Sequence, residues 1–305
     1  METNNQIQKT GAAQLAAVLK ADSVQEQFTN ALGEHKDAFV ASLIDLYNGD
    51  KSLQGCKPNA LVCEALRAAT LRLPLNKALG FAYIVAYNVN VKQPDGTWKK
   101  EKTPSFLLGY KGYIQLAMRT GQYRTINADV VYEGELGEVD KLTGDIRFNG
   151  QRKSDKVAGY FCYFELLNGF SKTLYMSVED MAKYAKRFSA GIDRNTTAET
   201  LVKMANQPED GKGVGWTSNF TSMALKTVIR RLLSKYGYLS VEMQGAMATE
   251  TENAQAGDIM PEPKATIEEM ADYEEITAQG TSPGTAGNTQ ASASNEPQEN
   301  EMPEY

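Results

Sequence analysis

The segment FAYIVAYNVNVK (Phe81–Lys92) leads through Pro94-Asp95-Gly96 into WKKEKTPSFLL (Trp98–Leu108), and this stretch decides the fold. Its first arm is apolar at every odd position, while its even positions turn polar from Asn88 onward. A period of two predicts a β-strand with one face on a core and the other towards solvent. Pro-Asp-Gly favours a turn, so we expect a β-hairpin over residues 81–108. Its tip would be cationic, because the tip region carries Lys99, Lys100 and Lys102.

The chain continues as GYKGYIQLAMRTGQYR (109–124), which predicts a helix that stops near Gly121. Its apolar residues recur at helical spacing, namely Tyr110, Ile114, Ala117 and Met118. Another face should carry polar residues four positions apart, namely Lys111, Gln115 and Arg119. Arg124 follows the end of this helix. A basic hairpin that runs into a basic helix flanked by aromatic residues favours a groove wall for nucleic acid. A solvated lysine hairpin and an ordinary amphipathic helix would give the same pattern.

Charge is divided unevenly along the 305 residues, whose net charge is −6. Residues 246–305 hold 13 acidic residues and a single lysine, whereas residues 51–124 hold 12 basic and three acidic residues. The body is therefore basic although the whole chain is acidic. From residue 246 onward the composition is too polar to offset the entropy of ordering. We expect N-terminal helices at 1–50, a DNA-binding core at 51–245 and an acidic, mostly disordered tail at 246–305.

The remaining body alternates helix and strand signals. Residues 11–48 predict two helices, whose lack of surplus basic charge favours subunit packing over DNA contact. Asn168-Gly169 predicts a second hairpin, because this pair suits a type I′ turn. Ser177 then resembles the cap of a helix that ends with Lys186, Arg187 and Phe188. A long helix is predicted after Trp216, and it carries Lys226, Arg230 and Arg231.

Several catalytic chemistries lack a matching motif. No G-x-x-x-x-G-K-[ST] sequence is present to cradle a triphosphate. His35 is the only histidine, so neither a conventional zinc site nor a histidine-activated nucleophile is expected. The acidic connector Glu133–Asp145 keeps a metal-dependent nuclease open, although its glycines favour a solvated loop. Three cysteines, no apolar leader and no long apolar run favour a cytoplasmic protein without a membrane segment.

These segments, in this order, resemble the RecT family of phage recombinases. Two motifs carry most of the resemblance: Gly109–Gly121 (GYKGYIQLAMRTG) and Trp216–Leu232 (W-x-x-N-F-x-x-M-A-L-K-T-V-I-R-R-L). The AGYFCYF strand at 158–164 supports it, and the similarity covers about residues 15–240. It suggests a prophage of a Gram-positive bacterium as the source.

The resemblance implies an α+β fold with a small antiparallel sheet and a long hairpin packed against helices. It also implies an ATP-independent single-strand annealing protein, not a bond-breaking enzyme. Such a protein binds single-stranded DNA, holds the annealed duplex and forms a homo-oligomeric ring or helical filament. A phage exonuclease and a host single-strand-binding protein are the expected partners. No cofactor is expected, and Mg²⁺ would act only as a DNA counterion.

We expect cationic side chains to grip phosphates while base edges stay free for pairing. The candidate DNA contacts are Lys99, Lys100, Lys102, Tyr110, Lys111, Gln115, Arg119, Arg124, Lys186, Arg187, Phe188, Lys226, Arg230 and Arg231. Arg230 and Arg231 point about 100° apart on a helix, so we expect only one to face DNA. Tyr113 and Trp216 are further candidates for stacking on bases, although a core position suits Trp216 better. The alternatives are a non-annealing single-strand binder, the nuclease and a structural phage protein.

Overall fold

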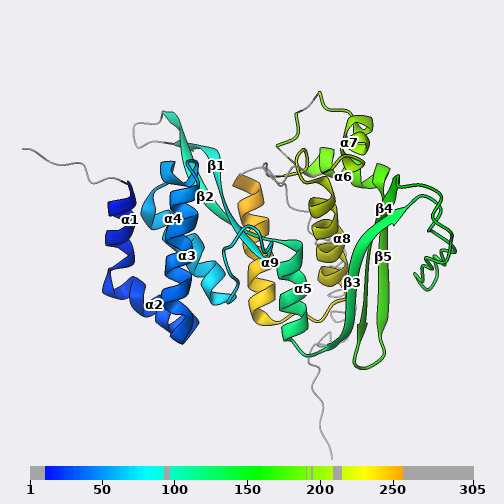
Figure 1. Cartoon of the computed structure of the whole chain (residues 1–305), viewed down its shortest axis with the longest axis horizontal. Helices are drawn as coiled ribbons and strands as arrows, with labels where there is room; N and C mark the ends of the chain where they lie inside the picture. Colours follow the sequence, from blue (N-terminus) through cyan, green and yellow to red (C-terminus); the bar gives the residue numbers. More distant parts are fainter. Residues whose placement is uncertain (1–10, 93–96, 190, 194, 209–214, 257–305) are drawn as a thin grey trace, which may run out of the picture. The chain divides into compact units, whose positions relative to one another are not determined.

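The computed structural model describes residues 11–92, 97–189, 191–193, 195–208 and 215–256. These residues form a mixed α+β fold with two small antiparallel sheets (Figure 1). One sheet is a long two-stranded hairpin, and the other has three strands in the order β3-β4-β5. Apolar side chains from the helices and both sheets join in one buried cluster. The expected α+β fold, with a long hairpin packed against helices, is confirmed.

Helices α1 (Gly11–Leu19), α2 (Asp22–Leu32), α3 (Lys36–Gly49) and α4 (Pro58–Thr70) precede the hairpin, with single 3₁₀ turns at Gly33–His35 and Leu53–Gly55. The prediction of two helices over residues 11–48 is wrong. The chain breaks at Ala21, which is extended, and again at Gly33, whose φ of 56° suits glycine. Phe28, Leu43 and Leu61 are fully buried. Residues 11–50 thus share a core with α4.

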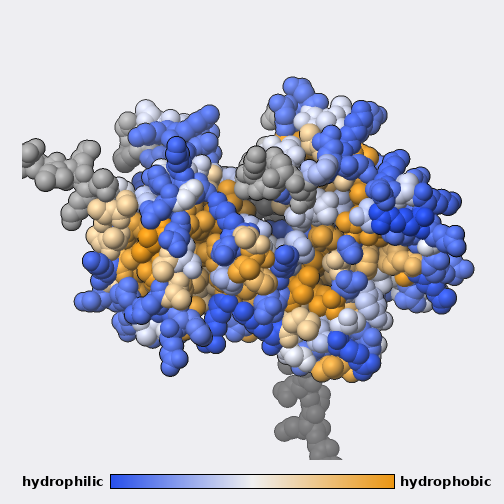
Figure 2. Space-filling model, in the orientation of Figure 1, coloured by the Kyte–Doolittle hydropathy of each residue, from blue (hydrophilic) through white to orange (hydrophobic). Residues whose placement is uncertain are grey.

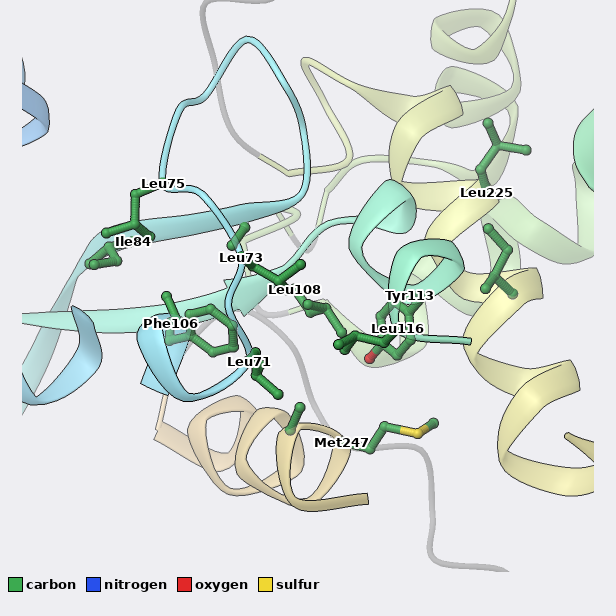
Figure 3. Packing of buried hydrophobic residues seen from close by; sticks show 14 of the residues in the cluster. Leu71, Leu73, Leu75, Ile84, Phe106, Leu108, Tyr113, Leu116, Leu225 and Met247 are labelled. Atoms are coloured by element: carbon green, nitrogen blue, oxygen red, sulfur yellow. The ribbon is translucent and has the colours of Figure 1, made fainter. Parts of the chain in front are cut away.

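Strands β1 (Ala82–Lys92) and β2 (Trp98–Leu108) form the predicted hairpin, with Ala82 opposite Leu108. The predicted Pro-Asp-Gly turn at 94–96 lies outside the described residues. The assignment of the odd positions to the core is wrong, because Ala82 and Ile84 are the fully buried residues. Both faces of the hairpin base are apolar, and α4 and the segment after it cover the even face. Figure 3 shows Leu75 of that segment beside Ile84.

Helix α5 (Tyr110–Arg119) follows the hairpin directly. Its predicted apolar stripe is only partly right, because Tyr113 and Leu116 are buried and Met118 is 47% exposed. Gly112 explains the difference. A β-carbon there would lie 2.2 Å from the backbone oxygen of Phe81, so only glycine lets the helix approach the hairpin this closely. This close approach brings the face of α5 that carries Tyr113 onto the core, where Tyr113 is fully buried.

The three-stranded sheet contains β3 (Tyr123–Tyr132), β4 (Val157–Leu166) and β5 (Ser171–Ser177). The predicted Asn-Gly hairpin joins β4 to β5, and Gly169 has a φ of 85°. The side-chain oxygen of Asn168 accepts a hydrogen bond from the Phe170 N–H at 2.9 Å. The connector between β3 and β4 is pinned by its own backbone hydrogen bonds and by a Val139–Ile146 bridge.

Three helices follow the three-stranded sheet along the chain: α6 (Val178–Phe188), α7 (Ala198–Ala205) and α8 (Phe220–Tyr236). The predicted cap at Ser177 is confirmed, since its hydroxyl accepts from the Asp180 N–H at 3.1 Å. Helices α6 and α8 pack against the three-stranded sheet (Figure 1). Val228 and Ile229 of α8 are fully buried. The long helix predicted from the sequence is therefore the central support of this sheet.

Helix α9 (Val241–Ala256) crosses residue 246, where the composition predicted that the disordered tail begins. Met243, Ala246 and Met247 are buried, and α9 contacts β2 and α5. Figure 3 shows Met247 below Leu116 of α5. Two methionines therefore extend the apolar surface past the predicted boundary. The predicted tail from residue 257 onward lies outside the described residues, and the division at 1–50 and 51–245 stays a prediction.

Candidate nucleic-acid interface

A cleft of about 470 Å³ lies between the hairpin base, the start of α5 and the segment that leads into α8. We call it the hairpin cleft. The strand residues on its wall are the odd positions Tyr83, Val85 and Tyr87 of β1, together with Leu107 and Leu108 of β2. In Figure 2, hydrophilic residues cover the hairpin on one side and α6 and α7 on the other. The residues expected in a core thus form an open aromatic wall.

Lysines approach the hairpin cleft from three elements. Lys77 and Lys226 are among its lining residues. Lys111 stands beside it, because its stem passes 3.5 Å from the position that a β-carbon would take on Gly80. The hydroxyl of Tyr83, a cleft residue, lies 3.2 Å from the same point. Lys226 thus lines the hairpin cleft and Lys111 lies near the cleft residue Tyr83, while their convergence on one DNA trough stays a prediction.

Gly80 makes this arrangement possible. Its φ of +74° is unfavourable for other residues, and it turns the chain from Lys77 into β1. The Lys111 ammonium lies 5.9 Å from the ring centroid of Tyr110, within the range of a cation–π contact. Tyr110 itself lines the cleft. The first turn of α5 thus presents an aromatic ring and a cation side by side, a combination suited to a base and its phosphate.

Lys77 shares its charge with Asp50, whose carboxylate lies 2.7 Å from the ammonium. Burial acts to raise the pKa of Asp50, but hydrogen bonds from Lys77 and the Ser52 N–H outweigh burial and lower the pKa. Asp50 is therefore ionised at neutral pH. Because Asp50 already neutralises the charge of Lys77, we expect Lys77 to attract a DNA phosphate less strongly than Lys111 does.

The long helix α8 delivers Lys226 to the cleft, and Ser222 lies one turn earlier on the same face. Arg230 lies one turn later, is half-buried, and has its Nε inside the protein. Arg231 is also half-buried, and its guanidinium lies 5.5 Å from the ring centroid of Tyr184 on α6. Neither arginine lines the hairpin cleft in the described residues. That only one of the two faces DNA stays a prediction.

Helix α6 carries the other predicted group. Lys186 and Arg187 are exposed, and Phe188 is half-buried with its ring 4.7 Å from that of Tyr184. The helix ends directly before Ser189, a cleft residue, so these side chains lie near the margin. Trp216 is buried with its ring 5.2 Å from that of Phe220, which confirms the core interpretation of the tryptophan.

The hairpin lysines divide between two faces. Side chains alternate along β2, so Lys99 shares its face with the cleft residue Leu107, whereas Lys100 and Lys102 share the opposite face. All three are exposed. The stem of Lys102 lies against Gly55, with its Cδ 2.9 Å from the position of a glycine β-carbon. The three lysines predicted for the cationic tip therefore lie on both faces of β2, and their contact with DNA stays a prediction.

Other predicted contacts lie apart from the cleft. Arg119, two turns along α5, donates hydrogen bonds to the backbone oxygens of Leu71 and Arg72. Arg124 forms an ion pair with Glu165 at 2.8 Å, and Gln115 is half-buried in the middle of α5. The stacking role considered for Tyr113 is wrong, because its ring is fully buried. DNA contact by Arg119, Arg124 and Gln115 stays a prediction.

Sequence reasoning missed Lys77, Tyr83 and Tyr87. Lys77 follows Pro74 in a segment without helical or strand periodicity, so its position had no local signal. The alternation of Tyr83, Val85 and Tyr87 was visible, but bulky apolar residues at period two indicate a covered face without saying what covers it.

The described part of the chain contains no group of three or more His, Cys, Asp or Glu residues that could hold a metal ion. Carboxylates of the Glu133–Asp145 connector serve its turns. Glu135 accepts from the Tyr132 N–H at 2.7 Å, and Asp140 accepts from the Leu142 N–H at 2.8 Å. The bonds from the Leu142 and Thr143 N–H groups lower the pKa of Asp140. Among the described helices, none is long and apolar enough to span a membrane.

The RecT family model matches residues 37–267, about three quarters of the chain. The chain belongs to the RecT family. It is 39% identical over 262 residues to uncharacterized protein YqaK of Bacillus subtilis (strain 168), which covers 86% of this chain and 80% of that protein. It is 27% identical over 233 residues to Protein RecT of Escherichia coli (strain K12), which covers 74% and 76% of the two chains.

The resemblance inferred from the two motifs is thereby confirmed. Membership in the RecT family associates this chain with DNA recombination, single-strand annealing and interaction with single-stranded DNA. Members of the family are annealing proteins and in general not enzymes. The Bacillus relative agrees with the expected Gram-positive source.

Proposed function

We propose that this RecT family protein anneals complementary DNA strands without ATP, and that it grips single-stranded DNA at the hairpin cleft. The observation that carries the proposal is the approach of Lys111 and Lys226 to one aromatic-walled cleft from two different helices. Ammonium groups neutralise phosphates without reading sequence. Aromatic faces accept any base, so the combination suits a binder that pairs whatever sequence it holds.

Strand pairing then draws its free energy from the base pairs. The protein lowers the search cost by holding a strand in an ordered array, which requires several copies in a ring or helical filament. The apolar faces of α1–α3 pack in the core that these helices share with α4. Their outer, polar surfaces are therefore the candidates for contact between copies. A phage exonuclease and a host single-strand-binding protein are the proposed partners, in the bacterial cytoplasm. Mg²⁺ would enter only as a DNA counterion.

We further propose that the hairpin tip inserts between stacked bases as a wedge. This proposal rests on the length of β1 and β2 and on the cationic residues near their tip. Deletion of Pro94–Thr97 should slow annealing while the backbone contacts at the hairpin base persist. Full annealing rate after this deletion would contradict the wedge.

The decisive experiment mixes two complementary labelled oligonucleotides with the full chain in buffer without ATP, and follows pairing by fluorescence. We expect strong acceleration by the wild-type chain, and a marked loss for Lys111→Ala and Lys226→Ala. Lys20→Ala is the matched control, because Lys20 is an exposed lysine at the end of α1. Circular dichroism establishes that each variant is folded.

Three results would contradict the proposal in different ways. Tight binding of single strands without acceleration of pairing would identify a non-annealing single-strand binder. Cleavage of a labelled strand with Mg²⁺ or Mn²⁺ would identify a nuclease. An equal loss of annealing in Lys20→Ala would show that the loss is not specific to the lysines of the hairpin cleft.

A further inference from the structure

The β3–β4 connector ends in a tight, well-braced turn at Glu138–Asp145, which we call the connector tip. The N–H of Asp140 donates to the Asp145 oxygen at 2.9 Å, and the Gly144 N–H donates to the Asp140 oxygen at 2.8 Å. Gly144 has a φ of +75°, which suits glycine at a turn. Lys172 of β5 also donates to the Thr143 oxygen. The connector tip is therefore held in one shape against the sheet.

Leu142 stands at the apex of the connector tip and is 94% exposed. Acidic side chains flank it, namely Glu138, Asp140 and Asp145, against Lys141 of the tip itself and Lys172 of β5, which contacts Thr143. A lone exposed leucine is ordinary on a protein surface. A leucine at the apex of a braced acidic turn forms a protruding knob. It is a candidate for a protein–protein contact if the protein also carries a complementary recess.

Such a recess lies between α2, α4, α5 and the start of α9, with a volume of about 770 Å³. We call it the helix cleft. Its apolar lining comes from Ala31, Leu66, Leu71 and Leu116. Its cations are Arg72 and Arg119, which are positioned by bonds to the backbone oxygens of Ala31 and Leu71. One acidic residue, Glu242, also lines it, so its ionisable lining has an excess of positive charge.

We propose that the connector tip of one copy docks into the helix cleft of the next copy. Leu142 would meet the leucine lining, and the flanking carboxylates would face Arg72 and Arg119. The two partners are complementary in both polarity and charge, an acidic knob with an apolar apex and an arginine-bordered recess with an apolar lining. This pairing commits the cleft to a second copy of the same chain.

The positions of knob and recess favour a continuing assembly. In Figure 1 the connector projects beyond β3 and β4, whereas α2 and α4 lie on the other side of α5. A contact between two different surfaces is heterologous, so each copy keeps one free knob and one free recess. Repetition gives a ring or a filament, which is the kind of array that strand pairing along DNA requires. The inference rests on the proposed function for its context.

The first test compares Leu142→Ser with Leu167→Ser in the full chain. Leu167 is also an exposed leucine, located at the β4–β5 turn and not part of the connector tip. Assembly on long single-stranded DNA is followed by sedimentation, and binding of single copies is measured on a short oligonucleotide. We expect Leu142→Ser to raise the concentration for half-assembly about tenfold to a hundredfold, as for loss of one buried leucine. Short-oligonucleotide binding should stay unchanged, and Leu167→Ser should behave as wild type.

The second test identifies the partner surface. A photo-crosslinking amino acid replaces Leu142, and heavy- and light-isotope copies are mixed on DNA before irradiation. Crosslinks between copies should map to residues 27–31, 66–72 or 116–120, which line the helix cleft.

Crosslinks to another surface, or unchanged assembly of Leu142→Ser, would overturn the docking contact. A wild-type chain that pairs strands without assembling would overturn it too, while leaving annealing intact. A chain that assembles through the connector tip but pairs no strands would instead refute the proposed function and leave this contact standing.

Discussion

Arg119 of α5 donates from Nη1 to the backbone oxygen of Leu71, 2.6 Å away, at the end of α4. Its Nη2 donates to the oxygen of Arg72 at 3.0 Å. The last carbonyls of a helix have no partner within the helix, so a cation there satisfies both their hydrogen bonding and the helix dipole. Arg72 itself has a φ of 51°, which is unusual for a residue other than glycine. Arg119 thus fastens α5 to a strained turn.

Replacement of Arg119 by alanine should therefore act on stability. We expect Arg119→Ala to lower the free energy of unfolding by about 1–2 kcal/mol, because two backbone oxygens lose a charged donor. Urea unfolding measures this loss. Arg124→Ala serves as the control, since its exposed ion pair with Glu165 should contribute less than about 1 kcal/mol. Unchanged stability together with weaker DNA binding would assign Arg119 to DNA instead.

The lysines of the hairpin cleft should act on the salt dependence of DNA binding. Each neutralised phosphate contributes about −0.7 to the slope of log affinity against log salt on single strands. We expect Lys111→Ala and Lys226→Ala each to reduce the magnitude of that slope by about 0.7, with folding intact. Titrations on one oligonucleotide at several salt concentrations give the slope. If Lys20→Ala changed it equally, the effect would reflect the overall charge of the protein and not the cleft.

Local signals predicted the elements of this fold well. The turn at Asn168-Gly169, the stop at Gly121 and the cap at Ser177 each depend on a few neighbouring residues, and each is present. The hairpin could be predicted for the same reason, because its period of two runs over a whole strand. The side of the hairpin that faces the core depends on helices elsewhere in the chain, and periodicity contains no such information.

The candidate site was predictable only in part. Lys111 and Lys226 belong to helices whose sequence motifs are conspicuous, and both reach the hairpin cleft region. Arg119 has the same helical spacing as Lys111, yet its partner is Leu71, 48 residues earlier in the chain. A long-range contact of this kind decides whether a cation is available to DNA. Spacing along one helix cannot reveal it.

Stability should depend on pH in the alkaline range because of Cys162, which is fully buried in β4. Burial raises the pKa of its thiol from 9.0 to about 12. Between these values the unfolded chain loses a proton that the folded chain keeps, so the free energy of unfolding falls as pH rises above 9. One such group gives a slope of up to about 1.4 kcal/mol per pH unit. Tyr123 adds to it, since burial raises its pKa to about 12.

Cys162→Ala should therefore show a shallower fall in the free energy of unfolding between pH 9 and 10.5 than wild type. Urea unfolding with a reducing agent at several pH values measures the two slopes, and comparison of slopes removes the packing loss of the substitution itself. Cys63→Ala is the matched control, because Cys63 is exposed. Parallel pH profiles for Cys162→Ala and wild type would show that the Cys162 thiol reaches solvent before the protein unfolds.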